Sequence, residues 1–408
     1  MSASSRPLTL GLLVLGLVGA PGCGSGGSPS PGDRFVGVAT PEYPAPHPPL
    51  PQVVSLRGPV VAAPNLVAIT FQGDPLGAGI ASFVSQLAAS KYWTQATAEY
   101  GAGLLSASPP LQLSEQPPAT LTDTEVQAWL ASKVMSLPGF PQPGLGTIYA
   151  LFYPDTTTIT TGTGMACRDF GGYHSDFELP TGEFVTYLVI PRCPAPSVGA
   201  LDSLTAATSH EMVEIATDPL PQDRPAWGRL DADHRSWELQ GGEIGDVCAG
   251  LPGAWVRPPG VDNLVQRVWS NKAAAADRDP CEPMGVTPYF NSAPVLVDTV
   301  LVTDALGNTF ATLGASIAVG QKKTIELDLF SDAPTSGPWT VSAIDATSAF
   351  GGGDPVLSFS FDRNRGRNGD KLHLTITAMN QMSNRTAPFW IQNDLGGAKT
   401  IWMGVVAN

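Results

Sequence analysis

SHEMVEIATDP, residues 209–219, is the most informative segment of this chain. It is an apolar, helix-compatible run that ends at a proline, and a proline cannot continue a helix. Residues four apart lie on one face of a helix, so His210 and Glu214 can point at one metal ion. Glu211 lies about 100° round the helix from His210, close enough to reach a water molecule on that ion.

The segments before this helix alternate between strand and helix patterns. Buried-type strands are predicted at 66–71, 147–153 and 184–190. Helices are predicted at 80–87 and, after the capping box TDTE at 122–125, up to Pro138. The motif helix should run from about 197 or 200 to 217, with a packed side of Leu201, Leu204, Thr208, Met212 and Ile215. This interleaving predicts an α+β or α/β domain over residues 58–287.

The pattern of apolar and polar residues in the sequence changes after about residue 288. Apolar and polar residues alternate at 324–330, 356–361 and 371–377, and short closing strands are expected at 389–391 and 401–403. Short alternating strands separated by Gly, Asp and Asn turns are typical of a β-sandwich. Residues 288–408 are therefore predicted to form an all-β, Ig-like C-terminal domain, with His373 on its surface.

The composition excludes several classes of protein. The chain has 408 residues, of which 43% are hydrophobic and 14% charged, with 44 Gly and 39 Pro. This favours a loop-rich globular protein of two or three domains over a coiled coil or a disordered chain. The net charge is −14 and no basic cluster stands out. Nucleic acid is not expected as a partner, because phosphate binding requires clustered Lys and Arg.

The N-terminus has the pattern of a secretion signal. Arg6 precedes an apolar run at 8–18 that is too short to span a bilayer, and small residues lead to Cys23. Residues 1–23 are predicted to be a signal peptide with a lipobox-like Cys23, although Pro21 departs from that pattern. Residues 24–57 are predicted to be a Gly/Ser/Pro-rich tether, in which His47 is solvated. The protein is expected to be an outer-membrane or cell-surface lipoprotein, or extracellular, meeting the membrane only through a lipid anchor.

Four further cysteines fit an exported protein. An even number of cysteines in such a chain indicates disulfides. Three pairings are possible, and the pairs Cys167–Cys193 and Cys248–Cys281 are favoured because each closes a local loop. Zinc binding by these four is not expected, since none of their spacings is C-x-x-C.

Catalytic zinc takes three protein ligands and leaves one position for water. After His210 and Glu214, the third ligand is sought in GEIGDVC, residues 242–248, which offers Asp246 and, close behind it, Glu243. A shell of one imidazole and two carboxylates cancels the charge of the ion and polarises water weakly. A neutral third ligand would instead be His234 or His174. The ion is expected to be Zn²⁺, with Mn²⁺ or Ca²⁺ as alternatives for a carboxylate-rich shell.

The chemistry that would follow is hydrolysis. A bound ion lowers the pKa of its water, and Glu211 takes the proton as general base and delivers it to a leaving amine. Tyr173 or His174 could donate a hydrogen bond to the developing oxyanion. Other readings remain open for nearby residues: Asp218 as a helix-end residue, and Asp231 with Asp233 as solvated loop acids or a weak calcium pair. Tryptophans 227, 237, 255 and 269 could form core or a substrate groove.

These motifs resemble two known families. The SHEMVEIATDP helix, the GEIGDVC loop, VWSN at 268–271 and Cys281 resemble, in order, the EXORDIUM/phosphate-induced protein family and its bacterial relatives, over roughly residues 60–285. The plant members are extracellular or cell-wall proteins linked to growth, so the resemblance implies export and one shared site for His210, Glu211, Glu214, Glu243 and Asp246. The helix also resembles the H-E-x-x-H helix of zincin metalloproteases, with Glu214 in place of the second histidine.

Two functions are therefore weighed from the sequence. The first is an exported, surface-anchored zinc-dependent hydrolase, a metallopeptidase acting on a peptide or a cell-surface polymer. The alternative is a non-catalytic extracellular binding protein with a structural metal site and a sandwich that binds a glycan or protein. A purely structural surface protein is a third reading, which absence of bound metal would favour.

Overall fold

The computed structural model describes residues 42–408, except 240, 304–306 and 348–353. Its first half is built on a mixed sheet with the strand order β2 (Ser106–Ala107), β1 (Asn65–Thr70), β5 (Thr147–Tyr153), β8 (Phe184–Pro191) and β7 (Tyr173–Glu178). A short β3 (Leu111–Gln112) also pairs with β1. β1, β5 and β8 are parallel, as their apolar runs predict, whereas the edge strand β7 is antiparallel and was not predicted.

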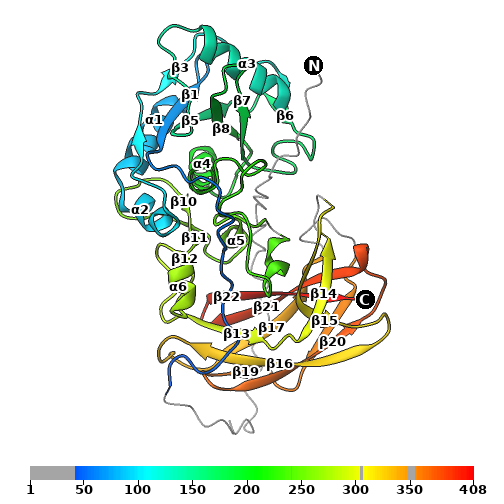
Figure 1. Ribbon diagram of the computed structural model, residues 1–408. Coiled ribbons are helices and arrows are strands. Elements are labelled where there is room, and N and C mark those ends of the chain that lie inside the picture. The colour runs from blue at the N-terminus through cyan, green and yellow to red at the C-terminus, as the bar shows by residue number, and fades with distance from the viewer. Residues whose placement is uncertain (1–41, 240, 304–306, 348–353) are drawn as a thin grey trace.

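Helices cover both faces of this sheet. Alternate residues of a strand face opposite sides, so Leu66 packs with α1 (Gly77–Ala89), α2 (Lys91–Thr97) and α4 (Ala200–Thr217), whereas Val67 packs with α3 (Asp123–Ser136). Figure 1 shows α3 and α4 on the two sides of the sheet. The predicted capping box holds the start of α3, with Thr122 and Glu125 bonded to each other's backbone N–H. A small pair of strands, β4 (Thr120–Thr122) and β6 (Thr158–Thr160), lies beside it.

The segment after α4 consists of short elements held by a disulfide. They are η2 (Arg235–Glu238), α5 (Asp246–Ala249), β9 (Trp255–Val256), β10 (Val265–Gln266), β11 (Val268–Trp269), α6 (Asn271–Ala275) and β12 (Cys281–Glu282). Cys248 of α5 is bonded to Cys281 of β12, and Cys167 to Cys193, so the predicted pairing is confirmed. Each bridge contributes about 3 kcal/mol by restricting the unfolded chain.

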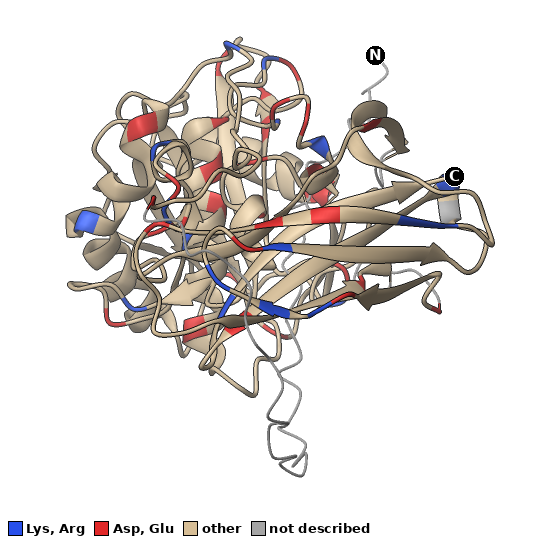
Figure 2. Ribbon diagram, turned by 90° about the horizontal axis from the view of Figure 1, so that it is seen from below, with Lys and Arg blue, Asp and Glu red and all other residues tan. Residues whose placement is uncertain are grey.

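The second half is the predicted β-sandwich. One sheet contains β13 (Phe290–Pro294), β16 (Lys322–Ser331), β20 (Lys371–Ala378) and β18 (Leu357–Phe361). The other contains β14 (Asp298–Thr303), β15 (Thr309–Ser316), β22 (Ala398–Ala407), β21 (Thr386–Leu395), β17 (Trp339–Asp345) and β19 (Arg365–Gly366). Phe290 and Trp339 pack across the two sheets with their ring centroids 5.4 Å apart. Figure 2 shows both basic and acidic segments on the strands of the sandwich.

The two halves share one hydrophobic core. Trp237 packs edge-on against Trp269 in the first half and against Trp402 of β22, with centroids 5.7 and 5.9 Å apart. Trp402 in turn meets Phe330 of β16. These two tryptophans of the first half, Trp237 and Trp269, are therefore core residues, as their default reading predicts. The sandwich is fused to the α+β half and does not hang from it on a linker.

The prediction of a solvated tether is wrong for residues 42–57, which pack across both halves. The His47 ring stacks on Phe330 with centroids 3.5 Å apart, and its Nε2 lies 3.4 Å from an oxygen of Asp277. Further along, Val53 forms a β-bridge with Leu230. Ala45, Leu50 and Val53 supply buried apolar side chains, so this segment gains enough burial to be ordered despite its prolines.

Other predictions for the N-terminus lie outside the described residues, namely the signal peptide, Cys23 and the tether up to residue 41. None of the helices in the described residues has both the length and the apolar character that a membrane span requires.

Candidate metal centre

The motif helix α4 is buried on all sides, and this explains why its polar residues matter. It lies against β7 and β8 on one side and against α1, α2 and β10 on the others, so every residue from Ser203 to Thr217 is buried (Figure 1). We expected one packed face, but the segment after the helix folds back over the second face. His210, Glu211 and Glu214 therefore have no access to bulk water and must be satisfied by one another or by a ligand.

The one-turn spacing brings the first two predicted ligands together. His210 Nε2 lies 3.2 Å from Glu214 Oε2, and 3.9 Å from Glu211 Oε1. These three side chains, His210, Glu211 and Glu214, form a group in which one donor atom of each could contact the same metal ion. The helix geometry inferred from the sequence is thus the geometry observed. Glu211, predicted as the base, also lies within ligand distance of the ion position.

A second imidazole comes from the edge strand β7. Because successive side chains of a strand point to opposite faces, His174 faces α4 while Tyr173 faces away from it. His174 Nδ1 lies 3.0 Å from Glu211 Oε2 and 3.6 Å from Glu214 Oε2. The hydroxyl of Tyr173 donates to Asp123 Oδ1 at 2.7 Å on the far side of the sheet. The predicted oxyanion role of Tyr173 is therefore wrong, whereas His174 belongs to the site.

The acidic loop reaches the site, as predicted, and delivers two carboxylates. Glu243 Oε1 lies 3.5 Å from His174 Nε2, and Asp246 Oδ1 lies 3.7 Å from His210 Nε2. The backbone N–H of Asp246 also donates to Glu214 Oε1 at 3.0 Å. Glu243 forms an ion-sized group with His174 and Glu214. Asp246 belongs to neither ion-sized group: its Oδ1 faces His210, and its Oδ2 accepts from the N–H of Glu243 at 3.3 Å. The geometry therefore favours Glu243 over Asp246 as the ligand from this loop.

Two glycines make this approach possible, and the sequence analysis overlooked both. A Cβ on Gly245 would lie 2.6 Å from Glu214 Oε1 and 2.9 Å from His210 Nδ1. Gly241 adopts φ +115°, and a Cβ there would lie 2.0 Å from Asp246 Oδ2. Only glycine allows such an approach. The signal was present in the motif itself, since a glycine directly before a candidate ligand indicates close packing.

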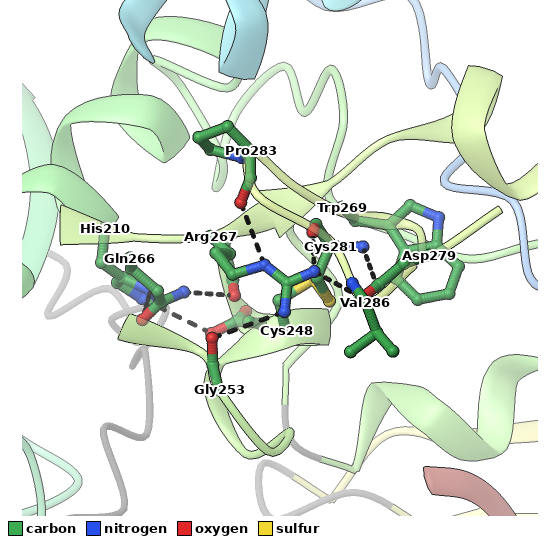
Figure 3. Close-up of a disulfide and its surroundings, with 12 residues drawn as sticks. His210, Cys248, Gly253, Gln266, Arg267, Trp269, Asp279, Cys281, Pro283 and Val286 are labelled. Atoms are coloured by element: carbon green, nitrogen blue, oxygen red, sulfur yellow. Dashed lines mark hydrogen bonds and ion pairs between the residues drawn. A yellow bond between two sulfur atoms is a disulfide. The ribbon is translucent and has the colours of Figure 1, made fainter. Parts of the chain in front are cut away.

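Gln266 was also missed, because nothing local marks it. It follows Val265 in β10, and its Oε1 lies 3.1 Å from His210 Nδ1 while its Nε2 donates to the Gly245 carbonyl at 2.7 Å (Figure 3). With its N–H₂ committed to Gly245, Gln266 presents an acceptor to His210, so Nδ1 of His210 carries the proton. The lone pair of His210 is then on Nε2, facing Glu214.

Arg267 stabilises the region around the disulfide that holds the acidic loop. Arg267 is buried and contacts Asp279 at 2.6 Å and the carbonyl oxygens of Pro283 and Cys281 (Figure 3). These contacts satisfy the guanidinium, which makes no ion pair with the cluster. The Cys248–Cys281 bridge thus fixes α5, whose first residue is Asp246.

Several buried atoms at the centre lack a hydrogen-bond partner among the described residues. They are His174 Nε2, His210 Nε2, Glu214 Oε2, both Glu243 carboxylate oxygens, Asp246 Oδ1 and Asp218 Oδ2. Buried polar atoms are almost always paired, so a group of them converging on one region indicates a ligand site. Nitrogen and carboxylate oxygen donors together fit a divalent cation such as Zn²⁺ or Mn²⁺.

The electrostatics lead to the same conclusion. Burial raises the pKa of Glu243 to about 8 and that of Asp218 to about 6, and burial and Glu214 raise the pKa of Asp246. Burial alone would lower the pKa of His210, but Glu214 and Glu211 outweigh it and raise the pKa to about 10. Without a cation, the cluster must take up protons to offset crowded negative charge. In the described part of the chain, no Lys or Arg forms an ion pair with these carboxylates.

The remaining candidates lie apart from this centre or have other partners. His234 bonds to Asp231 at 2.8 Å and packs on Trp402, so it is not the third ligand. Asp231 also accepts from the N–H groups of Gln52 and Asp233, so few lone pairs of its carboxylate remain to bind calcium. Asp218 caps α4, as predicted, yet it is also buried beside the cluster.

Comparisons with known proteins add no assignment. Neither the family models nor the curated proteins include a match. Among solved structures, domains 4 and 5 of the S-layer protein SbsC are 13% identical over 35% of this chain and 84% of that one, with a TM-score of 0.17. A GH5 xyloglucanase from Bacteroides ovatus is 14% identical over 23% and 17%, with a TM-score of 0.15. A chimeric titin Z1Z2 is 13% identical over 29% and 95%, with a TM-score of 0.16. Scores this low carry no argument, and membership of the EXORDIUM family stays a prediction.

Proposed function

We propose that this protein is an exported, surface-anchored zinc-dependent hydrolase, a metallopeptidase acting on peptides or on a cell-surface polymer. Its N-terminal domain would be zincin-like and its sandwich Ig-like. The observation that carries the proposal is the convergence on α4 of unpartnered donor atoms from three segments: His174, His210 with Glu214, and Glu243. The two disulfides support export, since such bonds persist in oxidising compartments.

The residues have distinct roles in this proposal. His210, Glu214 and a carboxylate of the acidic loop hold the ion, which supplies Lewis-acid activation of water when bound. Glu211 would act as the general base toward an attacking water and would return the proton to the leaving amine. His174 donates from Nδ1 to Glu211 Oε2 at 3.0 Å, which orients that carboxylate.

One observation favours a second candidate, a protein whose metal is structural. The side chains of the cluster are no more than 3% exposed. They are those of His174, His210, Glu211, Glu214, Glu243 and Asp246. A hydrolase must admit a substrate to its base, whereas a structural ion needs no access. In this reading the ion joins the edge strand, the helix and the acidic loop, and the sandwich supplies the binding surface.

Two variants and one control distinguish these candidates. The purified protein is analysed for metal content and assayed on a broad peptide library. We expect His210→Ala to bind less zinc than the wild type, and Glu211→Gln to bind as much zinc as the wild type but to lose turnover. Glu178→Gln, an exposed residue on β7, is the matched carboxylate control and should change neither.

The outcomes of these measurements distinguish the hydrolase from the protein with a structural metal. Zinc that is retained in Glu211→Gln, with no turnover in any form of the protein, would support the structural candidate. That candidate also predicts that a chelator lowers the free energy of unfolding by about 2.7 kcal/mol at zinc concentrations a hundredfold above Kd. Absence of zinc after reconstitution would refute both.

A further inference from the structure

We infer that the cluster contains two cation positions bridged by Glu214, and not one. Position 1 lies among His210, Glu211 and Glu214, with His210 and Glu214 as ligands and Glu211 kept as the base beside them, and position 2 is formed by His174, Glu214 and Glu243. The inference rests on the metal site of the proposed function and adds a second ion to it.

The first argument is how the donor atoms are grouped. In each position, one donor atom from every member lies within 4.8 Å of the others, which suits a single ion. The two groups have no imidazole in common, and Glu214 is their one shared member. Glu214 Oε2 lies 3.2 Å from His210 and 3.6 Å from His174, so this oxygen faces both positions, while Oε1 accepts from the Asp246 N–H. A carboxylate can bind two ions at once, as in sites that hold metals about 3.5–4 Å apart.

The second argument is where the imidazole lone pairs point. Gln266 fixes the proton of His210 on Nδ1, so its Nε2 faces position 1. In the same way, an ionised Glu211 can only accept from His174 Nδ1, so the Nε2 lone pair of His174 faces Glu243, 3.5 Å away. Both Nε2 atoms are buried and without a hydrogen-bond partner. Each imidazole therefore offers one ligand atom, oriented by an acceptor on its other nitrogen, and the two atoms serve different positions.

The third argument is charge. Among the described residues, five buried carboxylates belong to the cluster around these two imidazoles: Glu211, Glu214, Asp218, Glu243 and Asp246. A further buried acid, Asp176, lies near Asp218. If the five carboxylates of the cluster are ionised and the imidazoles are neutral, one divalent ion leaves three of their negative charges uncompensated, whereas two ions leave one. Buried charge without compensation costs several kcal/mol per ion, so the second cation removes most of a penalty that the first cannot. The two-position arrangement therefore explains why so many acids are collected here.

Asp218 lies next to Glu243, at the side of position 2. Its Oδ1 accepts from the N–H of Ala226, while Oδ2 is buried and unpartnered. Gly228 lies between Asp218 and Glu243: a Cβ there would be 2.8 Å from Asp218 Oδ2 and 3.8 Å from Glu243 Cγ. Asp218 thus flanks Glu243 and can accept from a water bound at position 2.

The test counts metal ions per chain. The purified protein is stripped with a chelator, reconstituted with Zn²⁺, desalted and analysed for metal and protein content. We expect about two equivalents of zinc per chain in the wild type. His174→Ala and Glu243→Gln should each keep about one equivalent, His210→Ala should keep the other, and Glu214→Gln should bind the least.

Matched controls account for adventitious binding. His373→Ala removes an exposed imidazole of the sandwich, and Glu178→Gln an exposed carboxylate of β7; both should keep about two equivalents. A second measurement avoids variants that fail to fold. In wild-type protein loaded with Mn²⁺, two ions sharing Glu214 should be spin-coupled, with an electron paramagnetic resonance signal weaker than that of the same concentration of isolated Mn²⁺.

Three results would overturn the second position. One is a single equivalent that is lost in His210→Ala and retained in His174→Ala. Another is a single equivalent lost in both variants, which would mean one ion held between the two imidazoles. The third is an uncoupled Mn²⁺ signal at full occupancy. All three leave the hydrolase proposal intact, whereas two bound ions without turnover would refute hydrolysis and retain both positions.

Discussion

Replacing Gln266 with methionine tests the least obvious part of the metal centre. Gln266 is fully buried, and among the candidate ligands in the described residues its side chain hydrogen-bonds to His210 alone. Methionine has nearly the same length and fills the same space, but it can neither accept from His210 Nδ1 nor donate to the Gly245 carbonyl. The substitution therefore removes the orientation of one ligand without removing a donor atom of the site.

The magnitude follows from the two bonds that are lost. Losing an outer-sphere partner of a ligating histidine typically costs 10–100-fold in metal affinity, or about 1.4–2.7 kcal/mol. The metal-free protein is also weakened, because His210 Nδ1 and the Gly245 oxygen remain buried without partners at about 1–3 kcal/mol each. We therefore expect the Kd for zinc to rise 10–100-fold and the melting temperature of the metal-free protein to fall.

The assay is competition for Zn²⁺ against a chelating dye at constant pH. Gln86→Met is the matched control, because Gln86 is half-buried on α1 and its side chain bonds Asp262, which is not a member of the cluster. It should leave the Kd unchanged. An unaltered Kd in a folded Gln266→Met protein would refute the assignment of the His210 tautomer and, with it, the orientation of its lone pair.

Three further predictions concern protons, the disulfide and the N-terminal segment. The pKa of His210, raised to about 10 without metal, means that zinc binding at pH 7 should release protons, visible as a buffer-dependent enthalpy in calorimetry. Since this folded-state pKa lies above the unfolded value of 6.5, the contribution of His210 to the stability of the metal-free protein should be complete below pH 6.5 and lost as the pH rises through 10; a flat profile would contradict this. Replacing Cys248 and Cys281 with serine should cost about 2–5 kcal/mol of unfolding free energy in urea titrations and weaken zinc binding, because the bridge fixes α5. His47→Ala should destabilise the protein by about 1–3 kcal/mol through loss of the buried stack on Phe330, and a change near zero would show that the segment is only loosely bound.

Much of the metal centre was predictable because its chemistry is local. Residues one helical turn apart meet whatever surrounds the helix, so His210 and Glu214 were identified from spacing alone. The pairing of Cys248 with Cys281 follows from the short loop that it closes. That same loop made the approach of the acidic segment predictable, although not which carboxylate faces which imidazole.

Other parts could not be derived from the sequence. Strand periodicity states that Tyr173 and His174 face opposite sides, but only the packing of α4 against one face decides that His174 is the residue in the site. Residues 42–57 have the composition of a linker, and their order comes from surfaces on both halves that the segment itself does not encode. Gln266 has no motif, since its role depends on a carbonyl and an imidazole brought from other segments.

The sequence by itself determined the motif helix, the α+β and sandwich halves, the two disulfides and the ligand pair on one helical turn, because each depends on interactions between residues near in the chain or on a simple periodicity. The tertiary structure alone decided that the helix is buried on every side, that the second imidazole comes from an edge strand, and that the carboxylates meet with their charges uncompensated. Those features arise where segments distant in sequence exclude water from a shared space, and there the cost of burying charge sets what the cluster must bind.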